Sequence, residues 1–364
     1  MSTRAILPCV ALVGAAIISA LGTSLVARWA AATGFVDHPG GRKAHDRPTP
    51  LGGGVAITLA ALLPIVLAIS FAWLLADNPP SWLPDSLRIH LPGIASKTFV
   101  GLGIVVAAVT MCAIGLADDV RPMQARVKFI GQVLIALFLV VGCNLRLMSH
   151  LPSSLSIFLS VLWILTLTNA FNFLDNMDGL AAGVGMIAAA VFAVAALAAG
   201  QLFVPVCCAL LAGALLGFLA FNFHPARVYM GDAGSLVIGM LLAVFTILTT
   251  FASPDEGQEP FGVLAPLVVM AVPLYDTCSV VFLRWRLGVP IWTGDRRHFS
   301  HRLVRRGMGV RQAVLVIWLA TLVTAMPAIL LSRATWSLAW GIVVQTILVV
   351  ALVALLEIDR REKP

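Results

Sequence analysis

Five aspartates stand where long apolar stretches meet short polar segments: Asp118, Asp119, Asp175, Asp178 and Asp232. A carboxylate at the edge of a membrane is unfavourable unless a partner offsets its lost hydration. Several carboxylates that converge on one face favour a cation there, and a divalent metal would in turn hold a phosphate substrate. These positions therefore predict a magnesium-dependent site at a lipid surface.

Three of these aspartates have a structural alternative that the residues leave open. Asp118 and Asp119 end an apolar run, where the negative end of a helix opposes adjacent carboxylates, and a solvated acid pair neutralised by Arg121 is the alternative to a cation site. Asp232 lies in a glycine-flanked turn that opens the next run, where it would either cap a helix or bring Mg²⁺ beside a phosphate.

The middle acidic segment places four polar side chains at a spacing of three: Asn169, Asn172, Asp175 and Asp178. If the helix continues through them, they share one face. The alternative for Asp178 is a cap on the following helix, which would not account for the other three. We therefore predict a substrate site in this segment.

The segment 284–311 is rich in arginine and includes Arg297, His298, His301 and Arg302. Basic residues beside a membrane are also explained by topology and by attraction to anionic headgroups, at about 1 kcal/mol each. That alternative explains the arginines but not the histidines. His298 and His301 are therefore expected to face one ligand.

Three further features carry weaker signals. The segment 34–54 combines three consecutive glycines with preceding basic residues and His45, which suits a phosphate-facing loop, although glycine also serves close helix packing. Lys128 would meet a lipid phosphate or extend to the membrane surface. Asp276 lies inside an apolar run, where a carboxylate is by default functional or paired.

These residues must be positioned by membrane helices. The chain has 364 residues, of which 60% are hydrophobic and 11% charged. A membrane helix needs about 20 apolar residues. Continuous runs rich in Ala, Leu and Gly favour helices over a barrel. We predict an all-α polytopic membrane protein, one integral membrane domain over 1–364, with eleven helices near 5–27, 55–76, 97–117, 127–148, 153–171, 180–199, 202–221, 235–252, 261–283, 312–332 and 335–356.

The positive charges predict which side the chemistry faces. Nineteen of the 24 lysines and arginines fall in alternate connections, which places those connections in the cytoplasm. The amino terminus is then outside and the carboxyl terminus cytoplasmic, as an odd number of helices requires. The net charge of +7 follows from this topology and gives no reason to expect nucleic-acid binding. The connections predicted to be cytoplasmic include the segments with the candidate catalytic residues, near 34–54, 118–128, 172–179, 222–235 and 284–311.

Six sequence runs resemble one known family. They read G-L-A-D-D-V, R-V-K-F-I-G-Q, N-A-F-N-F-L-D-N-M-D-G-L, F-N-F-H-P-A-R-V-Y-M-G-D-A-G-S, P-L-Y-D and D-R-R-H-F-S-H-R-L. Their order and spacing, over about residues 34–311, are similar to those of the polyprenyl-phosphate N-acetylhexosamine-1-phosphate transferases. The R-K-A-H loop, D-R-x-H and eleven helices resemble the WecA-like branch more than the branch that acts on UDP-MurNAc-pentapeptide.

The resemblance implies an activity and its partners. Such enzymes transfer a sugar 1-phosphate from a UDP-sugar to undecaprenyl phosphate with Mg²⁺, release UMP, and start bacterial envelope glycans. It implies Mg²⁺ as the cofactor, with Mn²⁺ as an alternative, a bacterial cytoplasmic membrane and a homodimer. GlcNAc is the expected sugar, with GalNAc, FucNAc and QuiNAc as alternatives.

The resemblance also implies roles for the acidic and basic residues. Asp232 corresponds to the metal ligand, and Asp118 and Asp119 to the acidic pair near the metal and the lipid phosphate. Lys128 corresponds to the basic residue on the lipid-phosphate side. The expected metal ligands are therefore Asp232 and Asp118, and the expected catalytic residues are Asp118, Asp119, Lys128, Asp175 and Asp178.

The remaining matched positions correspond to substrate contacts. Asp178 is similar to the residue that meets uracil, Tyr229 to the aromatic residue that stacks on the base, and Asn222 to a nucleotide contact. The expected substrate-binding residues are Asn172, Asn222, Tyr229, His45, Arg297, His298, His301 and Arg302. One departure stands at Ser300, where that branch typically has a second histidine, and it bears on the choice of sugar.

We expect one in-line displacement at the β-phosphorus of the UDP-sugar by a lipid phosphate oxygen. That oxygen is largely anionic at neutral pH, because its second pKa is about 6. A covalent aspartyl-phosphate route remains an alternative. A second class is an ion- or proton-coupled transporter, although transporters hold their carboxylates near the membrane midplane.

Overall fold

The computed structural model describes residues 3–38, 48–249, 260–290, 292 and 297–357, so the predicted contact His45 lies outside the described residues. The α-helices are α1 Thr3–Thr33, α2 Gly53–Leu75, α3 Asp85–Arg88, α4 Leu91–Ser96, α5 Thr98–Val120, α6 Ala125–Leu137, α7 Ser153–Leu174, α8 Leu180–Ala198, α9 Phe203–Asn222, α10 Gly231–Leu248, α11 Ala265–Val269, α12 Ala271–Arg286, α13 Phe299–Arg305, α14 Val310–Ala325 and α15 Trp336–Glu357. A π-helical turn, Phe138–Gly142, follows α6, and 3₁₀ segments cover Pro260–Leu264 and Met326–Arg333. The strands β1 Val36–Asp37 and β2 Thr49–Pro50 pair antiparallel.

The predicted membrane helices are confirmed. Within the described residues, ten helices are long and apolar enough to cross a membrane. An eleventh crossing forms if Phe261–Val269 and Ala271–Arg286 count as one span, which bends by 63° at its break. The chain is therefore an all-α membrane protein that crosses the membrane many times.

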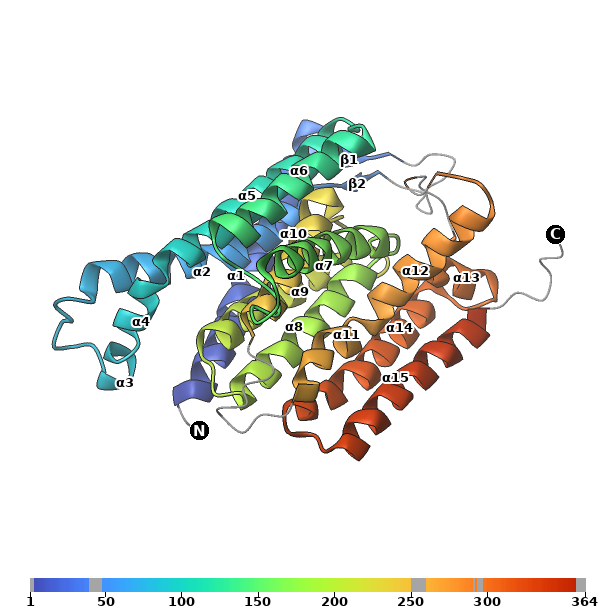
Figure 1. Ribbon diagram of the computed structural model, residues 1–364. Helices are drawn as coiled ribbons and strands as arrows, with labels where there is room; N and C mark the ends of the chain where they lie inside the picture. The colour runs from blue at the N-terminus through green and yellow to red at the C-terminus, as the bar shows by residue number, and fades with distance from the viewer. Residues whose placement is uncertain (1–2, 39–47, 250–259, 291, 293–296, 358–364) are drawn as a thin grey trace.

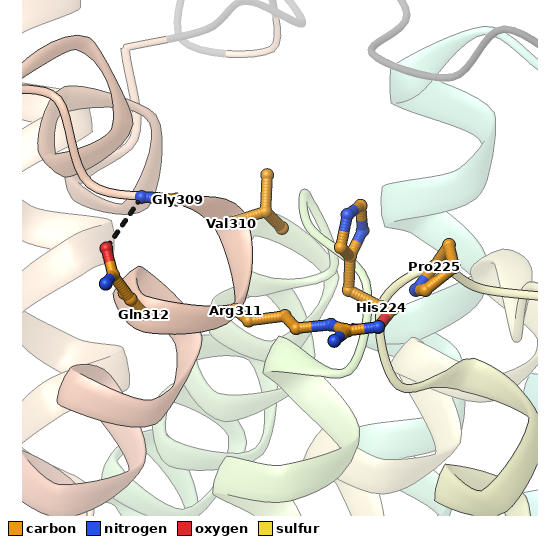
Figure 2. Close-up of a pocket in the computed structure, with 6 residues that line it drawn as sticks. All are labelled: His224, Pro225, Gly309, Val310, Arg311 and Gln312. Atoms are coloured by element: carbon orange, nitrogen blue, oxygen red, sulfur yellow. Dashed lines mark hydrogen bonds between the residues drawn. The ribbon is translucent and has the colours of Figure 1, made fainter.

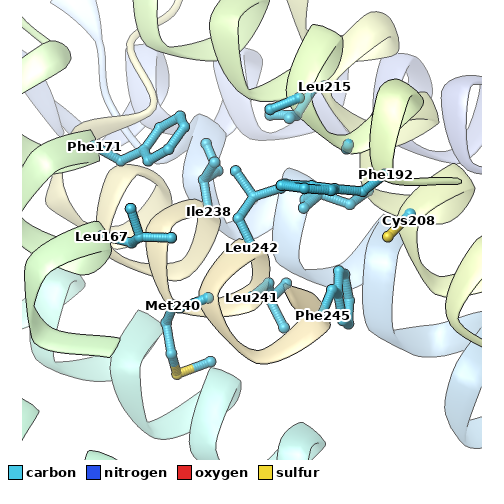
Figure 3. Close-up of a cluster of buried hydrophobic side chains, with 14 of the residues drawn as sticks. Leu167, Phe171, Phe192, Cys208, Leu215, Ile238, Met240, Leu241, Leu242 and Phe245 are labelled. Atoms are coloured by element: carbon cyan, nitrogen blue, oxygen red, sulfur yellow. The ribbon is translucent and has the colours of Figure 1, made fainter. Parts of the chain in front are cut away.

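Helix α10 lies at the centre of the bundle. The membrane-crossing parts of α9 and α10 are 78% buried inside the protein, whereas those of α1 and α15 are 17% buried and face outward. In Figure 3, apolar side chains of α10 meet Leu167 and Phe171 of α7, Phe192 of α8 and Leu215 of α9. The core therefore holds α10 firmly, and its first turn carries Asp232.

Several helix ends meet at one end of the bundle. The two strands lie at this end, and α3 and α4 lie at the opposite end (Figure 1). Backbone hydrogen bonds join the strand residue Pro50 to Tyr229, and Gly53 and Gly54 at the start of α2 to the residues before α10. The predicted cytoplasmic segments that the structure describes are thus brought together.

Two glycines allow this close approach. A Cβ added at Gly54 would lie 2.1 Å from the backbone nitrogen of Gly234, and one added at Gly115 would lie 2.4 Å from the backbone of Asp232. Backbone atoms cannot yield as a flexible side chain can. Helices α2 and α5 therefore approach α10 at glycines, next to the acidic residues.

Helix α7 is longer than predicted, but it ends before the last acidic positions. It ends at Leu174, and Asp175 already leaves the helical conformation. Asn169 and Asn172 therefore share a helical face, whereas Asp175 and Asp178 lie in the turn that follows. The conditional expectation of one face for all four residues is wrong.

Candidate active site

Three charged side chains from three helices meet at the centre of the site. The Lys128 ammonium on α6 contacts Oδ2 of Asp232 on α10 and lies 3.3 Å from Oδ2 of Asp118 on α5. The side chains of Lys128, Asp118 and Asp232 are 14%, 20% and 25% exposed. The ammonium of one lysine thus lies between two carboxylates that remain partly accessible, and the predicted magnesium site at these residues stays a prediction.

Asp119 faces the same helix end but binds backbone. Its Oδ1 accepts the amide hydrogen of Asp232 at 2.8 Å, and its Oδ2 accepts that of Ala233 at 3.1 Å. The first amide groups of a helix have no partner inside it, and a carboxylate there also interacts favourably with the helix dipole. Asp119 therefore caps α10 from a neighbouring helix and fixes the backbone that carries Asp232.

Amide side chains of α7 extend this network. Asn172 donates to Oδ1 of Asp232 at 2.8 Å and to the hydroxyl of Ser235 at 3.0 Å. One turn earlier, Asn169 donates to the buried Gln132 at 2.7 Å. Gln132 lies one turn after Lys128 on α6, so this bond ties α7 to α6 next to Lys128. We call Asp118, Asp119, Lys128, Asn172 and Asp232 the acidic centre.

Asp175 lies beside the acidic centre without a bonding partner. Within the described part of the chain, no group hydrogen-bonds or ion-pairs with its carboxylate. Burial, and then the negative charges of Asp232, Asp119 and Asp178, raise the pKa of Asp175 well above its usual range. The protonated form is therefore favoured more than in a solvated aspartate.

Asp178 does not cap α8, so that alternative is wrong. Its Oδ2 pairs with Nδ1 of His224 at 2.7 Å and accepts the backbone amide hydrogen of Ala226 at 3.0 Å. The residue before α8 is Gly179, with a φ of 76° and no side-chain cap. Asp178 therefore joins the turn after α7 to the turn after α9.

The predicted nucleotide contacts border the same turns. The Asn222 side chain accepts from the Gly179 backbone and donates to the Val228 carbonyl, each at 2.9 Å, so both its polar atoms bind backbone. The hydroxyl of Tyr229 hydrogen-bonds Thr49, and burial together with the charge of Asp178 raises the pKa of Tyr229 to about 12. Tyr229 is therefore neutral at physiological pH.

The predicted histidines lie on a short helix that faces α12. His298 precedes the first residue of α13, and its Nδ1 lies 2.8 Å from Oδ2 of the fully buried Asp276. His301 lies within α13 and also interacts with other groups of the protein. Asp276 is therefore a paired carboxylate. We call residues 297–305 the histidine segment.

Arg302 holds this segment to the carboxyl-terminal helix. Its guanidinium donates to Oε1 of Glu357 at 2.8 Å, to the Ser279 hydroxyl at 3.0 Å and to the backbone carbonyl of Arg297 at 2.5 Å. The hydroxyl of Tyr275 also donates to Glu357. A substrate role for Arg302 remains a prediction, because the partners that the described residues give it all belong to the protein.

Figure 2 shows a hollow lined by His224, Pro225, Gly309, Val310, Arg311 and Gln312. Its lining residue His224 is the partner of Asp178. Arg311 donates to the His224 carbonyl at 2.8 Å, and the Gly309 amide donates to Gln312 at 3.0 Å. The hollow therefore places the start of α14 against the turn that holds Asp178.

The acidic centre fits a magnesium ion on the chemistry of its donors. Asp118 and Asp232 each bind a protein group through Oδ1, namely the Met123 amide at 2.6 Å and Asn172, and each turns Oδ2 toward the same cation. Mg²⁺ usually takes one or two carboxylates and completes its shell with water and phosphate oxygens. In the described residues, no group of three or more His, Cys, Asp or Glu could hold a metal, so the two carboxylates would need water and phosphate oxygens beside them.

Sequence reasoning missed the residues that support these groups. Gln132, Asn176, His224, Ser300 and Glu357 hold functional side chains in place. Gln132 follows Lys128 by one helical turn, which is a signal that the spacing does contain. No such spacing marks Glu357, because its partner Arg302 lies 55 residues away in the sequence.

Comparison with known proteins gives one consistent result. Residues 101–250 match the family model described as glycosyl transferase family 4. A Bacillus subtilis protein named "probable undecaprenyl-phosphate N-acetylglucosaminyl 1-phosphate transferase" is 32% identical over 322 residues, 86% of this chain and 82% of the relative. Decaprenyl-phosphate N-acetylglucosaminephosphotransferase of Mycolicibacterium smegmatis is 34% identical over 380 residues, 95% of this chain and 88% of the relative. Undecaprenyl-phosphate alpha-N-acetylglucosaminyl 1-phosphate transferase of Yersinia pestis is 26% identical over 323 residues, 84% of this chain and 80% of the relative.

Proposed function

Because this chain belongs to the polyprenyl-phosphate N-acetylglucosamine-1-phosphate transferases of glycosyl transferase family 4, we propose that it transfers GlcNAc 1-phosphate from UDP-GlcNAc to undecaprenyl phosphate. UMP is the second product. The observation that carries the proposal is the cation position shared by Asp118 and Asp232, beside Asn172 and at the ends of membrane helices. The same placement gives the transporter alternative no support, since these carboxylates do not lie at mid-membrane.

The reaction is a single displacement at phosphorus. An oxygen of the lipid phosphate forms a bond to the β-phosphorus, and the bond from that phosphorus to the bridging oxygen breaks and leaves with UMP. The nucleophile is already anionic, so no side chain needs to remove a proton from it. The main barrier to offset is the repulsion between two anions.

The residues of the acidic centre divide this task. Asp118 and Asp232 would hold Mg²⁺, which when bound supplies positive charge against the diphosphate and the leaving UMP. Lys128, which lies next to both carboxylates, would bind a lipid phosphate at the membrane surface. Asn172 keeps Asp232 in orientation, and Asp119 fixes the backbone beneath it.

Other parts of the proposal concern placement. The distribution of positive charge supports a cytoplasmic site, an outer amino terminus and a cytoplasmic carboxyl terminus in a bacterial inner membrane. The carboxyl end of α15 contacts the histidine segment through Glu357, so this end of α15 lies on the same side as the site. A homodimer is expected because symmetric dimers are the commonest oligomers.

The test uses the full chain purified in lipid nanodiscs with undecaprenyl phosphate, Mg²⁺ and radiolabelled UDP-GlcNAc. We expect lipid-linked GlcNAc phosphate and an equal amount of UMP, both abolished by EDTA and restored by Mg²⁺, with Mn²⁺ as a comparison. UDP-GalNAc, UDP-FucNAc and UDP-QuiNAc in parallel identify the sugar. If none of the four yields a lipid-linked product, the proposed function is refuted.

A further inference from the structure

We propose that Asp276 is a positioning residue that holds His298 so that its second ring nitrogen, Nε2, meets the substrate. The inference rests on the proposed function and deepens it, because it names the group that orients a predicted substrate contact. Asp276 lies on α12, and His298 lies 22 residues later, at the start of α13.

The first step is how completely the protein uses the carboxylate. Asp276 is 0% exposed. One oxygen pairs with Nδ1 of His298, and the other accepts the backbone amide hydrogen of Phe299 at 3.1 Å. A buried carboxylate is unfavourable unless both oxygens are hydrogen-bonded, and here the histidine segment supplies both partners. Asp276 therefore has no oxygen left for a metal or a substrate.

The second step is how the imidazole is confined. The ring of Phe173 meets that of His298 edge-on, at 6.2 Å between centroids. The buried Arg284 lies over the same Phe173 ring at 5.3 Å. His298 is thus held between α12 and the end of α7. Within the described residues, Nε2 of His298 has no hydrogen-bond partner, so it is the ring nitrogen left for a ligand.

The third step is where this places the ring. Phe173 follows Asn172, whose amide binds Asp232. Two residues after His298, the buried hydroxyl of Ser300 donates to Oδ1 of Asn176 at 2.6 Å. The histidine segment therefore contacts Phe173 and Asn176, which lie on either side of Asp175 in the sequence, next to the acidic centre.

The hydrogen bond also determines which ring nitrogen carries the proton. An ionised carboxylate only accepts, so Nδ1 must donate to it, and in the neutral imidazole Nε2 is then an acceptor. An asparagine at 276 can instead donate its amide hydrogen to Nδ1. That would move the ring proton to Nε2 and reverse its hydrogen-bonding role with little change in volume.

The competing explanation is a buried pair that only stabilises the fold. A double-mutant cycle separates the two, because residues that act through one another are not additive. The variants are Asp276→Asn, His298→Gln and the double substitution. The matched control is Thr277→Ala on the same helix, whose hydroxyl bonds only the Pro273 carbonyl of its own turn.

The measurements are kcat and KM for UDP-GlcNAc in nanodiscs, together with the thermal unfolding midpoint. We expect Asp276→Asn to lower kcat/KM by about 10- to 100-fold, by analogy with the range found when the carboxylate behind a metal-bound histidine is changed. In the His298→Gln background the same change should alter kcat/KM less than about twofold. Thr277→Ala should match the wild type.

Three results would overturn the proposal. One is a normal kcat/KM for folded Asp276→Asn despite a lower unfolding midpoint, since this is the behaviour of a structural pair. Another is full additivity of the two substitutions. If Asp276→Asn does not accumulate, His298→Gln alone decides, because full activity of that variant rules out a substrate contact. Inactivity of the wild type with every UDP-sugar refutes the proposed function and this inference together.

Discussion

The acidic centre and the histidine segment each set carboxylates against basic side chains, but at different depths. Asp118 and Asp232 are 20% and 25% exposed and share one lysine, whereas Asp276 is fully buried and gives both oxygens to the histidine segment. A partly exposed carboxylate can exchange its cation for another, while a buried and fully bonded one fixes its partner. Depth thus separates the carboxylates suited to bind a ligand from the carboxylate suited to hold a side chain in place.

Asp119 shows that the acidic centre itself contains both kinds of carboxylate, one kind that can bind a ligand and one that holds other groups in place. It is adjacent to Asp118 in the chain, yet its oxygens accept two backbone amide hydrogens of α10. Adjacent residues on a helix point about 100° apart, so Asp118 faces Lys128 and Asp119 faces the start of α10. The following predictions test this division, from the largest expected effect to the smallest.

Substitution of Asp232 should have the largest effect. Asp232→Asn removes the charge from the cation position and keeps the size of the side chain, so we expect UMP release to fall by about 10²- to 10³-fold. The unfolding midpoint should stay near that of the wild type. Asp85→Asn is the matched control, because Asp85 is 92% exposed and pairs only with Arg88 at the opposite end of the bundle. Activity within twofold of wild type would remove Asp232 from the metal site.

Asp119 should respond to the shape of its replacement more than to its charge. Asp119→Ala leaves the start of α10 without its cap and should reduce the free energy of unfolding by about 1–2 kcal/mol, with a large loss of activity. Asp119→Asn keeps one of the two acceptor oxygens and the size of the side chain, so it should retain part of both. Denaturant unfolding and UMP release measure the two quantities. Equal loss in the two variants would show that the charge of Asp119 matters more than the cap.

Release of the histidine segment from α15 should have a smaller effect. Glu357→Gln keeps an acceptor for Tyr275 but removes the charge opposite Arg302. A charge-assisted hydrogen bond contributes about 1.5–3 kcal/mol, so we expect a loss of roughly tenfold in kcat/KM. Arg305→Gln is the control within α13. A normal kcat/KM for Glu357→Gln would separate α15 from the site.

Substitution of Asp175 should change how the stability of the protein depends on pH. Because its folded-state pKa is raised, its charged form is less favourable in the folded than in the unfolded chain, and it reduces stability as pH rises through that pKa. Asp175→Asn should therefore raise the unfolding midpoint at alkaline pH, and the gain should disappear as pH falls and the wild-type carboxyl is protonated. A gain that grows toward acid pH would contradict this sign.

Ser300 should give the smallest effect. Ser300→Ala removes the hydrogen bond to Asn176, worth about 1 kcal/mol, and its orphaned partner Asn176 still donates to the Phe173 carbonyl. We expect a decrease of a few-fold in kcat/KM and an unchanged order of preference among UDP-sugars. A reversed preference would assign Ser300 to the choice of sugar.

The membrane helices could be predicted because a continuous apolar run is a local feature of the sequence, which does not depend on tertiary contacts. The run that ends at Asp118-Asp119 and the glycine turn at Asp232 marked helix ends on one side. Their convergence followed from topology alone. The division of labour between Asp118 and Asp119 could not be predicted, because it depends on how α5 is rotated against α10.

The supporting contacts were beyond sequence reasoning for a similar reason. Asp178 could be assigned as a cap because caps are local, but its partner His224 lies 46 residues away on another turn. Asp276 could be recognised as paired or functional from its apolar surroundings. Its partner could not be named, because the bend between α11 and α12 and the path to α13 decide which side chain reaches it.

The Lys128 ammonium occupies the position between Asp118 and Asp232 at which we propose that a divalent ion binds. If Mg²⁺ binds there, it must displace the ammonium, so its affinity is set by the difference between the two interactions. Lys128→Met should therefore tighten Mg²⁺ binding in isothermal titration while slowing turnover. Without Mg²⁺, Lys128 still offsets the charge of two carboxylates, so the acidic centre should stay folded when magnesium is scarce.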